Sequence, residues 1–441
     1  MRLAEMSYLT VRAIRGPLLF VDALFAAQIG ELVSIVAPDK SRVTGEVLSI
    51  DGDCALLQVF GETHGLDLGT TRVIFHDAVK QAPLSSAVLG RVFDGSFLPK
   101  DGLPMFIPER FGDVCGAPLN PVARDLPQEM IETGLSVIDG LATLVKGQKL
   151  PLFSCSGLPG RELVTTLLRQ SRLPGDGRFV VVFVALGVSH HEADAYRQVL
   201  AEMEQPCVAF LNLAGDPVVE RLLAPRLGLT VAEDLAYNAG MEVLVIMSDM
   251  TNYCDALREV STSREELPGR RGYPGYMYSD LASLYERAGR LRGRCGSVTL
   301  LPVLTMPEDD ITHPIPDLTG YITEGQIVLS RELHQQGVFP PIDVLPSLSR
   351  LMQHGIGPGR SRADHREVAN RLYRSYSRGR ELRKLAAVVG REGLLDEDQA
   401  LLDFAEQFEK EFLHQRQRRD LAATLDTGSE LLRRFEQEPS C

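Results

Sequence analysis

The sequence predicts a multidomain α+β protein with an N-terminal β-barrel, a central α/β domain built on a parallel sheet, and a C-terminal helical bundle. The chain has 441 residues, which suits about three domains. Short strand-like runs occupy its beginning, nearly continuous apolar runs alternate with helical stretches in its middle, and charged helical stretches fill its end. These changes place the expected domains at residues 1–75, 76–350 and 351–441.

The barrel is predicted from short β-branched or alternating runs separated by turn residues such as Pro38-Asp39 and Asp51-Gly52-Asp53. These runs are residues 8–11, 32–36, 44–50 and 55–60. Closing such a sheet into a small barrel removes its exposed edges, so a closed barrel is the expected arrangement.

The central sheet is predicted from apolar runs at residues 179–186, 207–213, 243–247 and 298–304. Strands covered on both faces have such continuous apolar sequences, so we expect a parallel sheet between two helical layers. One helix is expected over residues 191–204. Another is expected to begin at Thr230, which with Glu233 has the pattern of a capping box, and to stop at Gly240.

The end of the chain has helical stretches dense in Glu and Arg, at residues 362–387, 396–418 and 425–437. Such charges are typical of a solvated helix face, and a face that docks a partner has the same composition. The sequence therefore predicts the helices and leaves both uses of their charges open.

Composition excludes several classes of protein. The formal net charge is −13, which argues against a nucleic-acid backbone as the main partner. The sequence has no run of 18 apolar residues and no signal-peptide pattern, so we expect a cytoplasmic chain. Its seven Cys lack a C-x-x-C pair, which is typical of reduced thiols rather than a disulfide frame or a zinc site. His190-His191 has no third ligand at a suitable spacing, so no metal site is expected.

Residues 146–170 have the layout of a phosphate-binding loop, with a short apolar strand, a turn and an amphipathic helix. A working loop reads G-x-x-x-x-G-K-[ST]. Its backbone N–H groups and its Lys hold phosphates, and its Ser or Thr holds Mg²⁺. An ordinary strand–turn–helix explains the layout equally well, although the helix N-terminus could still attract an anion.

The residues of this loop are wrong for phosphate chemistry. Ser154 stands at the first Gly of the pattern, Pro159 at the second, Gly160 at the Lys and Arg161 at the Ser or Thr, with Gly157 between them. Pro159 has no N–H to donate, Gly160 has no charge, and Arg161 cannot ligate a cation. The sequence therefore predicts a degenerate loop.

A family resemblance is carried by seven stretches in order along the chain. They are LGRVFDG at 89–95, TGLSVID at 133–139, GQKLPLFS at 147–154, SDMTNYC at 248–254, GRRGYPGY at 269–276, DDITHPIPDLTGYITEGQ at 309–326 and PPIDVLPSLS at 340–349. With them the chain, from about Tyr8 to Leu432, resembles the B subunits of V-type rotary ATPases of archaea and bacteria. It departs from that family at Cys155, where Gly is usual, and at Gly160, where His is usual.

The resemblance implies a central domain like that of RecA-type P-loop NTPases, in a non-catalytic regulatory subunit. Three such chains would alternate with three catalytic A subunits in a hexameric ring around a rotating shaft, with central-stalk and peripheral-stalk subunits attached. The complex would couple ATP synthesis or hydrolysis to the transport of hydrogen or sodium ions. The chain would meet the membrane only through this complex, in its cytoplasmic head. It would hold no cofactor tightly by itself, and ATP or ADP with Mg²⁺ would lie at the interface with the A subunit.

The resemblance also implies that Arg350 supplies an arginine finger in trans to the nucleotide of the neighbouring A subunit. A guanidinium suits this role because its permanent charge and its fork of donors stabilise charge spread over γ-phosphoryl oxygens. From spacing alone, Arg350 reads as one of many surface arginines. Tyr321 is expected near the same edge, where it either contacts the neighbour's nucleotide or packs in the interface.

Three further places bear on activity. Ala185, in an expected turn at residues 184–187, stands where catalytic ring subunits carry a glutamate that positions water, so no hydrolysis is expected here. Asp249 follows an apolar strand where a carboxylate would hold Mg²⁺, and capping the next helix is its favoured role. Arg270-Arg271 lies in a Tyr-rich loop of a kind that stacks nucleic acids, but the acidic chain favours an interface loop.

Two alternatives to a regulatory ring subunit remain. A self-sufficient ring ATPase of the secretion or transcription-termination type would need a Lys-Thr loop and a catalytic Glu, which Gly160, Arg161 and Ala185 do not provide. A purely structural ring spacer would take no chemical part. Hydrolysis by the isolated chain would favour the first alternative, and substitution of Arg350 tests the second.

Overall fold

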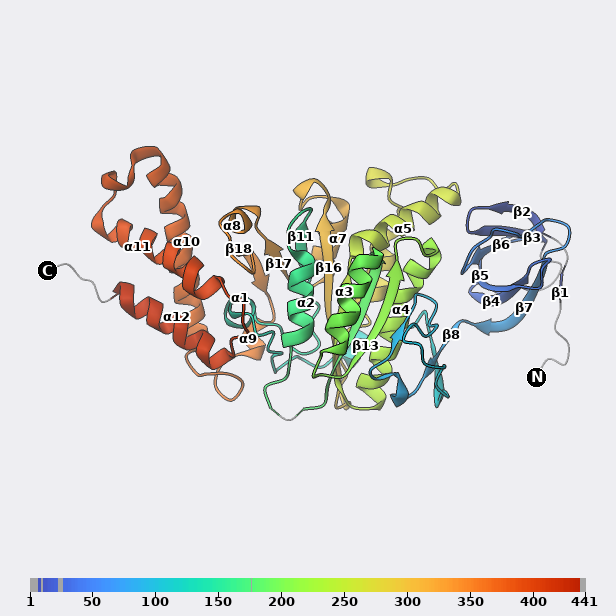
Figure 1. Cartoon of the computed structure of the whole chain (residues 1–441), viewed down its shortest axis with the longest axis horizontal. Helices are drawn as coiled ribbons and strands as arrows, with labels where there is room; N and C mark the ends of the chain where they lie inside the picture. The colour runs from blue at the N-terminus through green and yellow to red at the C-terminus, as the bar shows by residue number, and fades with distance from the viewer. Residues whose placement is uncertain (1–6, 9–10, 23–26, 176, 437–441) are drawn as a thin grey trace.

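The computed structural model describes residues 7–8, 11–22, 27–175 and 177–436. Figure 1 shows three bodies in a row: a β domain near the N-terminus, an α/β domain in the middle and a helical domain near the C-terminus. The predicted fold class is confirmed. No helix in the described ranges is both long enough and apolar enough to cross a bilayer.

The N-terminal domain is a seven-stranded antiparallel sheet with the order β1-β7-β4-β5-β6-β3-β2. Its strands are β1 (Ser7–Tyr8), β2 (Val11–Arg15), β3 (Leu18–Asp22), β4 (Glu31–Val36), β5 (Arg42–Asp51), β6 (Cys54–Val59) and β7 (Arg72–Val79). The two end strands, β1 and β2, follow each other in the chain, and the sheet curls around buried side chains such as Val33, Ile35 and Leu57.

Three of the predicted barrel strands are confirmed, because residues 32–36 and 44–50 fall in β4 and β5, and the run 55–60 matches β6 except for its last residue. The predicted run 8–11 lies partly outside the described residues. Strands β3 and β7 have no counterpart among the predicted runs, although β3 and the start of β7 lie within the expected β domain.

The barrel leads into a short antiparallel ribbon and then into the central sheet. The ribbon pairs β8 (Gln81–Leu84) with β10 (Arg110–Asp113). The central sheet has the order β18-β17-β11-β16-β14-β12-β13-β9, with β15 beside β16. Its strands are β9 (Val92–Phe93), β11 (Leu152–Cys155), β12 (Phe179–Val188), β13 (Cys207–Leu213), β14 (Glu242–Ser248), β15 (Gly289–Arg290), β16 (Ser297–Met306), β17 (Gly325–Leu329) and β18 (Ile342–Ser349).

The central sheet is parallel from β17 to β9, as the apolar runs predicted, and β18 is antiparallel to β17. Alternate side chains of β12 belong to two different cores. Val182 and Val184 pack with the helices of one face, and Val181 and Phe183 pack with those of the other. This follows from the two-residue period of a strand, and it explains why the strand sequence is apolar throughout.

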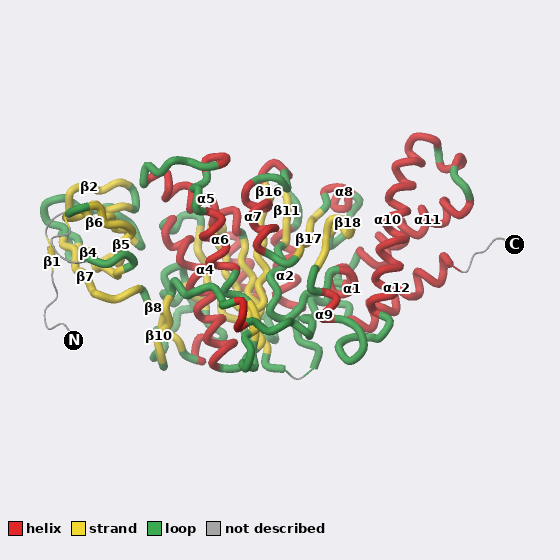
Figure 2. Tube along the Cα trace, turned by 180° about the vertical axis from the view of Figure 1, so that it is seen from behind, coloured by secondary structure: helices red, strands yellow, loops and turns green. Residues whose placement is uncertain are grey.

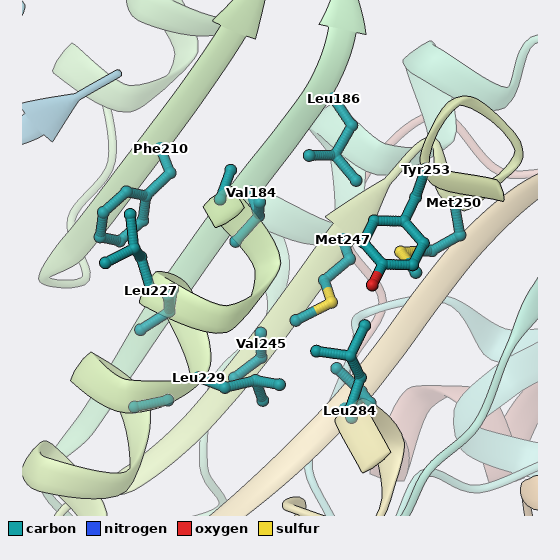
Figure 3. Close-up of a cluster of buried hydrophobic side chains, with 14 of the residues drawn as sticks. Val184, Leu186, Phe210, Leu227, Leu229, Val245, Met247, Met250, Tyr253 and Leu284 are labelled. Carbon is teal, nitrogen blue, oxygen red and sulfur yellow. The ribbon is translucent and has the colours of Figure 1, made fainter. Parts of the chain in front are cut away.

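Each face of the sheet has its own set of helices. One face carries α4 (Val218–Glu233), α5 (Met250–Ser263), α6 (Met277–Tyr285) and α7 (Pro314–Ile322). The other carries α1 (Ser136–Leu141), α2 (Gly160–Gln170), α3 (His190–Ala201) and α8 (Arg331–Gln335). Figure 3 shows the first core, in which Leu227 of α4 and Met250 of α5 meet Val184 and Met247 of the sheet. Figure 2 shows the whole chain from the side opposite to Figure 1, with α4, α5, α6 and α7 labelled.

The capping box predicted at Thr230 is wrong. Helix α4 begins twelve residues earlier, at Val218, and Thr230 lies near its C-terminal end, where its hydroxyl donates to the Arg226 carbonyl at 2.9 Å. Packing of this nearly all-buried helix on β12 and β13 outweighs the helix-breaking tendency of Pro225 inside it. Gly240, with a φ of 68°, follows the helix after a π-helical turn, so its prediction as the stop is confirmed.

The C-terminal domain consists of α10 (His365–Val389), α11 (Asp396–Gln407) and α12 (Leu421–Glu436), which begin near the predicted positions. It is joined to the central domain through the short helix α9 (Met352–Gly355). The helix predicted over 396–418 ends early, after a π-helical turn at Phe408–Leu413. Beyond it the Gln415 side chain donates to the Gly134 carbonyl at 2.7 Å and accepts from the Ser136 N–H at 2.7 Å. Docking onto the central domain therefore ends the helix.

Candidate functional site

The degenerate loop lies between the carboxyl end of β11 and helix α2, where a phosphate-binding loop belongs in an open α/β sheet. It borders a cavity of about 300 Å³. The predicted loop residues Ser154, Gly157, Gly160 and Arg161 all line this cavity, and Pro159 is the N-cap of α2 without a side-chain cap bond. The strand–turn–helix layout read from the sequence is thus confirmed.

The loop is shaped around a glycine at the position that a working loop gives to Lys. A Cβ atom placed on Gly160 would lie 2.9 Å from the Ser154 hydroxyl, closer than Cβ contacts normally come. Gly157 has a φ of 79°, which favours glycine. Inserting a Lys at position 160 alone would therefore make the Ser154 hydroxyl turn away, and the loop would still lack the Ser or Thr that holds Mg²⁺.

The backbone of the loop is held by an ion pair between Arg331 and Asp309, which was not predicted from the sequence. The Arg331 guanidinium donates to the Ser156 carbonyl at 3.0 Å, and it forms a fork with Asp309 at 2.7 and 2.9 Å. Burial and the nearby Asp309 carboxylate raise the pKa of the Cys155 thiol to about 11, so Cys155 stays protonated. No local sequence pattern predicts this pair, because Arg331 and Asp309 lie 22 residues apart and contact the loop at Ser156, in a third segment of the chain.

The carboxylates near this cavity are already engaged. Asp249 caps α5 by accepting from the Thr251 N–H at 2.8 Å, as predicted, and it also accepts from the Thr305 hydroxyl at 2.5 Å. Burial raises its pKa. Glu192 accepts from the backbone N–H and the hydroxyl of Ser189 in the capping box of α3. Neither side chain is placed as a free base for water.

The position that the resemblance matches to a catalytic glutamate, Ala185, is also closed. Ala185 is fully buried in β12, and the turn predicted at residues 184–187 is wrong because the strand continues to Val188 with a bulge. The predicted absence of a carboxylate at this point stands. His190 and His191 start helix α3, and the described residues contain no cluster of three metal-ligating side chains.

Arg350 lies at the opposite end of the sheet from this loop. It follows β18, whose last residue, Ser349, pairs with the first residue of β17, Gly325. Strand β17 runs parallel to β11, so Arg350 lies beside the start of these strands and the loop follows their end. The five residues of β17 alone separate the two ends by about 13 Å, at about 3.3 Å per residue. Arg350 therefore cannot complete its own chain's loop.

The Arg350 side chain is exposed, in the strand-to-helix turn that sequence analysis expected. Its guanidinium has no hydrogen-bond or ion-pair partner within the described part of the chain. Tyr321, near the end of α7, is 75% exposed and lies four residues before Gly325, so both predicted side chains belong to the same end of the sheet. Both are therefore available to another molecule.

A buried network holds the backbone on which Arg350 sits. The Arg350 N–H donates to the Glu324 carbonyl at 3.0 Å. The same carbonyl accepts from the amide of Gln148, at 3.0 Å, and this amide also donates to the Ser349 hydroxyl at 2.9 Å. Lys149, 3% exposed, pairs with Glu324 and Glu286, each at 2.8 Å. Gln148 and Lys149, two residues of the GQKLPLFS stretch, thus fix the backbone that leads into Arg350.

The basic–aromatic loop is only partly available. Arg271 pairs with Asp310 at 2.9 Å and Arg270 with Asp317 at 3.3 Å, while Tyr273 is buried against the Arg258 guanidinium. The exposed charge of the two arginines is thus largely compensated within the chain.

Family models match three parts of the chain, in the order of its three domains. They are the beta-barrel domain of the ATP synthase alpha/beta family at residues 11–75, its nucleotide-binding domain at residues 134–349, and the C-terminal domain of V and A type ATP synthase at residues 354–440. The chain is 65% identical to a V-type ATP synthase beta chain of Geotalea uraniireducens (strain Rf4), over 99% of this chain and 100% of that one.

The structure of the ATP synthase subunit NeqB from Nanoarcheaum equitans is also similar, with 37% identity and a TM-score of 0.74, covering 95% of this chain and 99% of that one. The chain belongs to the ATP synthase alpha/beta family and, within it, to the beta, or B, chains of the V type. The resemblance read from the sequence is confirmed, and a self-sufficient ring ATPase of another type is not favoured.

Proposed function

We propose that this B chain is the non-catalytic, regulatory subunit of its ATP synthase and completes the ATP site of a neighbouring catalytic A subunit with Arg350. The observation that carries the proposal is the placement of Arg350. Its exposed guanidinium is unpartnered within the described residues, and it stands at the end of the sheet away from a loop that lacks phosphate-binding residues. Such a side chain cannot reach its own chain's loop, which supports a role at a site that another subunit provides.

The chemistry of that site follows from the guanidinium. Arg350 would bind the γ-phosphoryl oxygens of ATP, held with Mg²⁺ by the A subunit, and would stabilise the charge that develops on them as the phosphoryl group moves. Tyr321, exposed at the same end of the sheet, would lie against the same nucleotide or pack in the interface. Three B and three A subunits would alternate in a ring, joined to central and peripheral stalks in the cytoplasmic head of an ion-translocating complex.

The isolated chain is expected to hydrolyse no Mg-ATP above background, because it has no Lys in the loop, no Glu at Ala185 and no free carboxylate at Asp249. Phosphate release from the purified full-length chain measures this. The assembled A–B ring under the same conditions is the positive control. Steady release by the B chain alone, abolished by Asp249→Asn, would contradict the non-catalytic assignment.

Gln148 is expected to act through Arg350. Replacing Gln148 by Ala removes the amide that holds Glu324 and Ser349, and a shift of about 1 Å in a catalytic group costs up to about 10²-fold in rate. We therefore expect a loss of between about tenfold and about a hundredfold in the kcat of the assembled ring, with little change in KM. A double-mutant cycle with Arg350→Ala checks the route, because Gln148→Ala should cost almost nothing more in that background.

Gln326→Ala is the matched control. Gln326 lies on β17, and its side-chain amide, like that of Gln148, donates to a backbone carbonyl, that of Pro346 on β18 at 3.0 Å. Its side chain makes no bond to the turn before Arg350 within the described residues. It should leave kcat nearly unchanged. If Gln148→Ala lowers kcat equally with and without Arg350, Gln148 merely stabilises the sheet. If Arg350→Ala itself leaves kcat unchanged, the result contradicts the arginine finger and not the role of Gln148.

A further inference from the structure

A second cavity, of about 250 Å³, lies where the barrel meets the central domain. Strands β5 and β6 of the barrel line one side, and helices α4, α5 and α6 line the other. It shares no lining residue with the cavity at the degenerate loop. Its volume is just below the range of about 300–1,000 Å³ that is usual for pockets of drug-sized ligands, so it suits a smaller molecule.

One pair of charges in this cavity is fully satisfied. Asp280 of α6 accepts from the Arg226 guanidinium at 2.6 Å and from the Tyr253 hydroxyl at 2.5 Å. These bonds join three helices of the central domain, and they leave neither oxygen of Asp280 in need of another donor. This pair is therefore part of the fold.

Two other cations that line the cavity are only partly satisfied by the described residues. Nε of Arg264 is buried and makes no hydrogen bond with any described residue, although the two terminal nitrogens of this guanidinium contact Gln58 and Glu266. Nζ of Lys80 lies 4.0 Å from the centre of the Phe60 ring and has no ion-pair partner among the described residues. Burial lowers the pKa of Lys80 to about 8. A buried donor without an acceptor is costly, so Nε of Arg264 calls for an acceptor, and the half-buried ammonium of Lys80 offers a second contact to the same occupant.

The balance of charge around the cavity favours an anion. Its lining carries three cations, Lys80, Arg226 and Arg264, against two carboxylates, Glu46 and Asp280, which leaves the lining a net charge of +1. Glu266, which pairs with Arg264 at 3.5 Å, lies outside the lining. Burial raises the pKa of Glu46, and the three cations oppose this rise. One negative charge would therefore neutralise the lining side chains and give Lys80 the counter-ion that it lacks among the described residues.

The rest of the wall is apolar. Leu222 and Leu223 of α4 and Leu257 and Val260 of α5 line it. We propose that this interdomain cavity binds a small organic monoanion, with its carboxylate between Lys80 and Arg264 and a short apolar chain against α4 and α5. Because its groups come from the barrel and from the central domain, such a ligand would link the two domains. Nothing in this proposal depends on the role of Arg350.

Hexanoate tests the proposal on the full-length chain by titration calorimetry at constant ionic strength. We expect saturable binding of a single equivalent, and none of hexylammonium, which has the same chain length and the opposite charge. Lys80→Met should weaken hexanoate binding about tenfold or more, since a hydrogen bond to a charged group is lost. Lys384→Met, at an exposed lysine on α10, is the matched control and should leave binding unchanged.

A measurement on the unaltered chain covers the case in which Lys80→Met does not fold. Cys115 lines the cavity and is exposed, whereas Cys295 is exposed elsewhere. Hexanoate should therefore slow the alkylation of Cys115 by a neutral reagent and leave that of Cys295 unchanged. A cavity filled by water alone would give no saturable binding and no protection, and it would overturn the proposal. Equal binding of hexanoate and hexylammonium would do the same.

Discussion

Replacing Arg350 by Lys is expected to lower the ATP turnover of the assembled A–B ring by about 10³- to 10⁵-fold, the range measured for arginine fingers in phosphoryl transfer. Lysine keeps a positive charge, but it loses the planar fork of donors that binds two phosphoryl oxygens at once. Folding and assembly should be unaffected, because the exposed Arg350 guanidinium makes no bond within the described residues. Steady-state hydrolysis by rings reconstituted with each variant measures the loss.

Nucleotide binding to the ring should change much less than turnover, because the finger acts on charge that develops during the reaction. Arg374→Lys, an exposed arginine on α10, serves as the control for the substitution itself and should retain full turnover. Unchanged turnover with Arg350→Lys would refute the finger, and it would favour a B chain that serves only as a spacer in the ring.

Replacing Arg287 by Met is expected to reduce the free energy of unfolding by about 3–5 kcal/mol, the usual cost of breaking a buried ion pair by removing one partner. Arg287 is 0% exposed. It forms a fork with Glu233 at 2.7 Å and donates to the Val114 carbonyl at 3.0 Å and the Thr230 hydroxyl at 2.9 Å. Methionine fills a similar space but leaves these acceptors without a donor.

Urea unfolding of the full-length chain, followed by tyrosine fluorescence, measures this change, since the chain contains no Trp. Arg292→Met is the matched control. Arg292 lies five residues further along and is exposed, so its loss should stay within about 0.5 kcal/mol. A similarly small change for Arg287→Met would mean that water replaces the guanidinium at its acceptors and that the pair is not important for stability.

Local sequence was sufficient where a pattern has a single physical meaning. The run at 179–186 contains no polar residue, and its short length and many Val residues favour a strand buried on both faces over a buried helix, so the parallel sheet was predictable. The degenerate loop was predictable for the same reason. Pro159 lacks an N–H and Gly160 lacks a charge in any fold, so their chemistry does not depend on tertiary structure.

Local sequence misled where packing competes with a local signal. Thr230 and Glu233 have the spacing of a capping box, yet burial of α4 against the sheet extends the helix through Pro225 and places Thr230 near its C-terminal end. At residues 184–187, β14 pairs with β12 only as far as Ala185, and pairing with β13, which resumes at Val188 after a bulge, carries β12 past the expected turn. In both cases contacts between segments distant in the chain outweigh a preference of a few residues.

By itself, the amino-acid sequence determined the domain types, the family and the loss of phosphate chemistry in the loop, because each depends on residue types at fixed spacing. Only the tertiary structure decided where Arg350 stands and what holds it. The antiparallel pairing of β18 with β17 carries Arg350 to the end of the sheet away from the loop, and the Gln148 amide meets Glu324 from 176 residues away. Strand direction and such long-range hydrogen bonds arise from pairing between segments, which no local pattern of residues records.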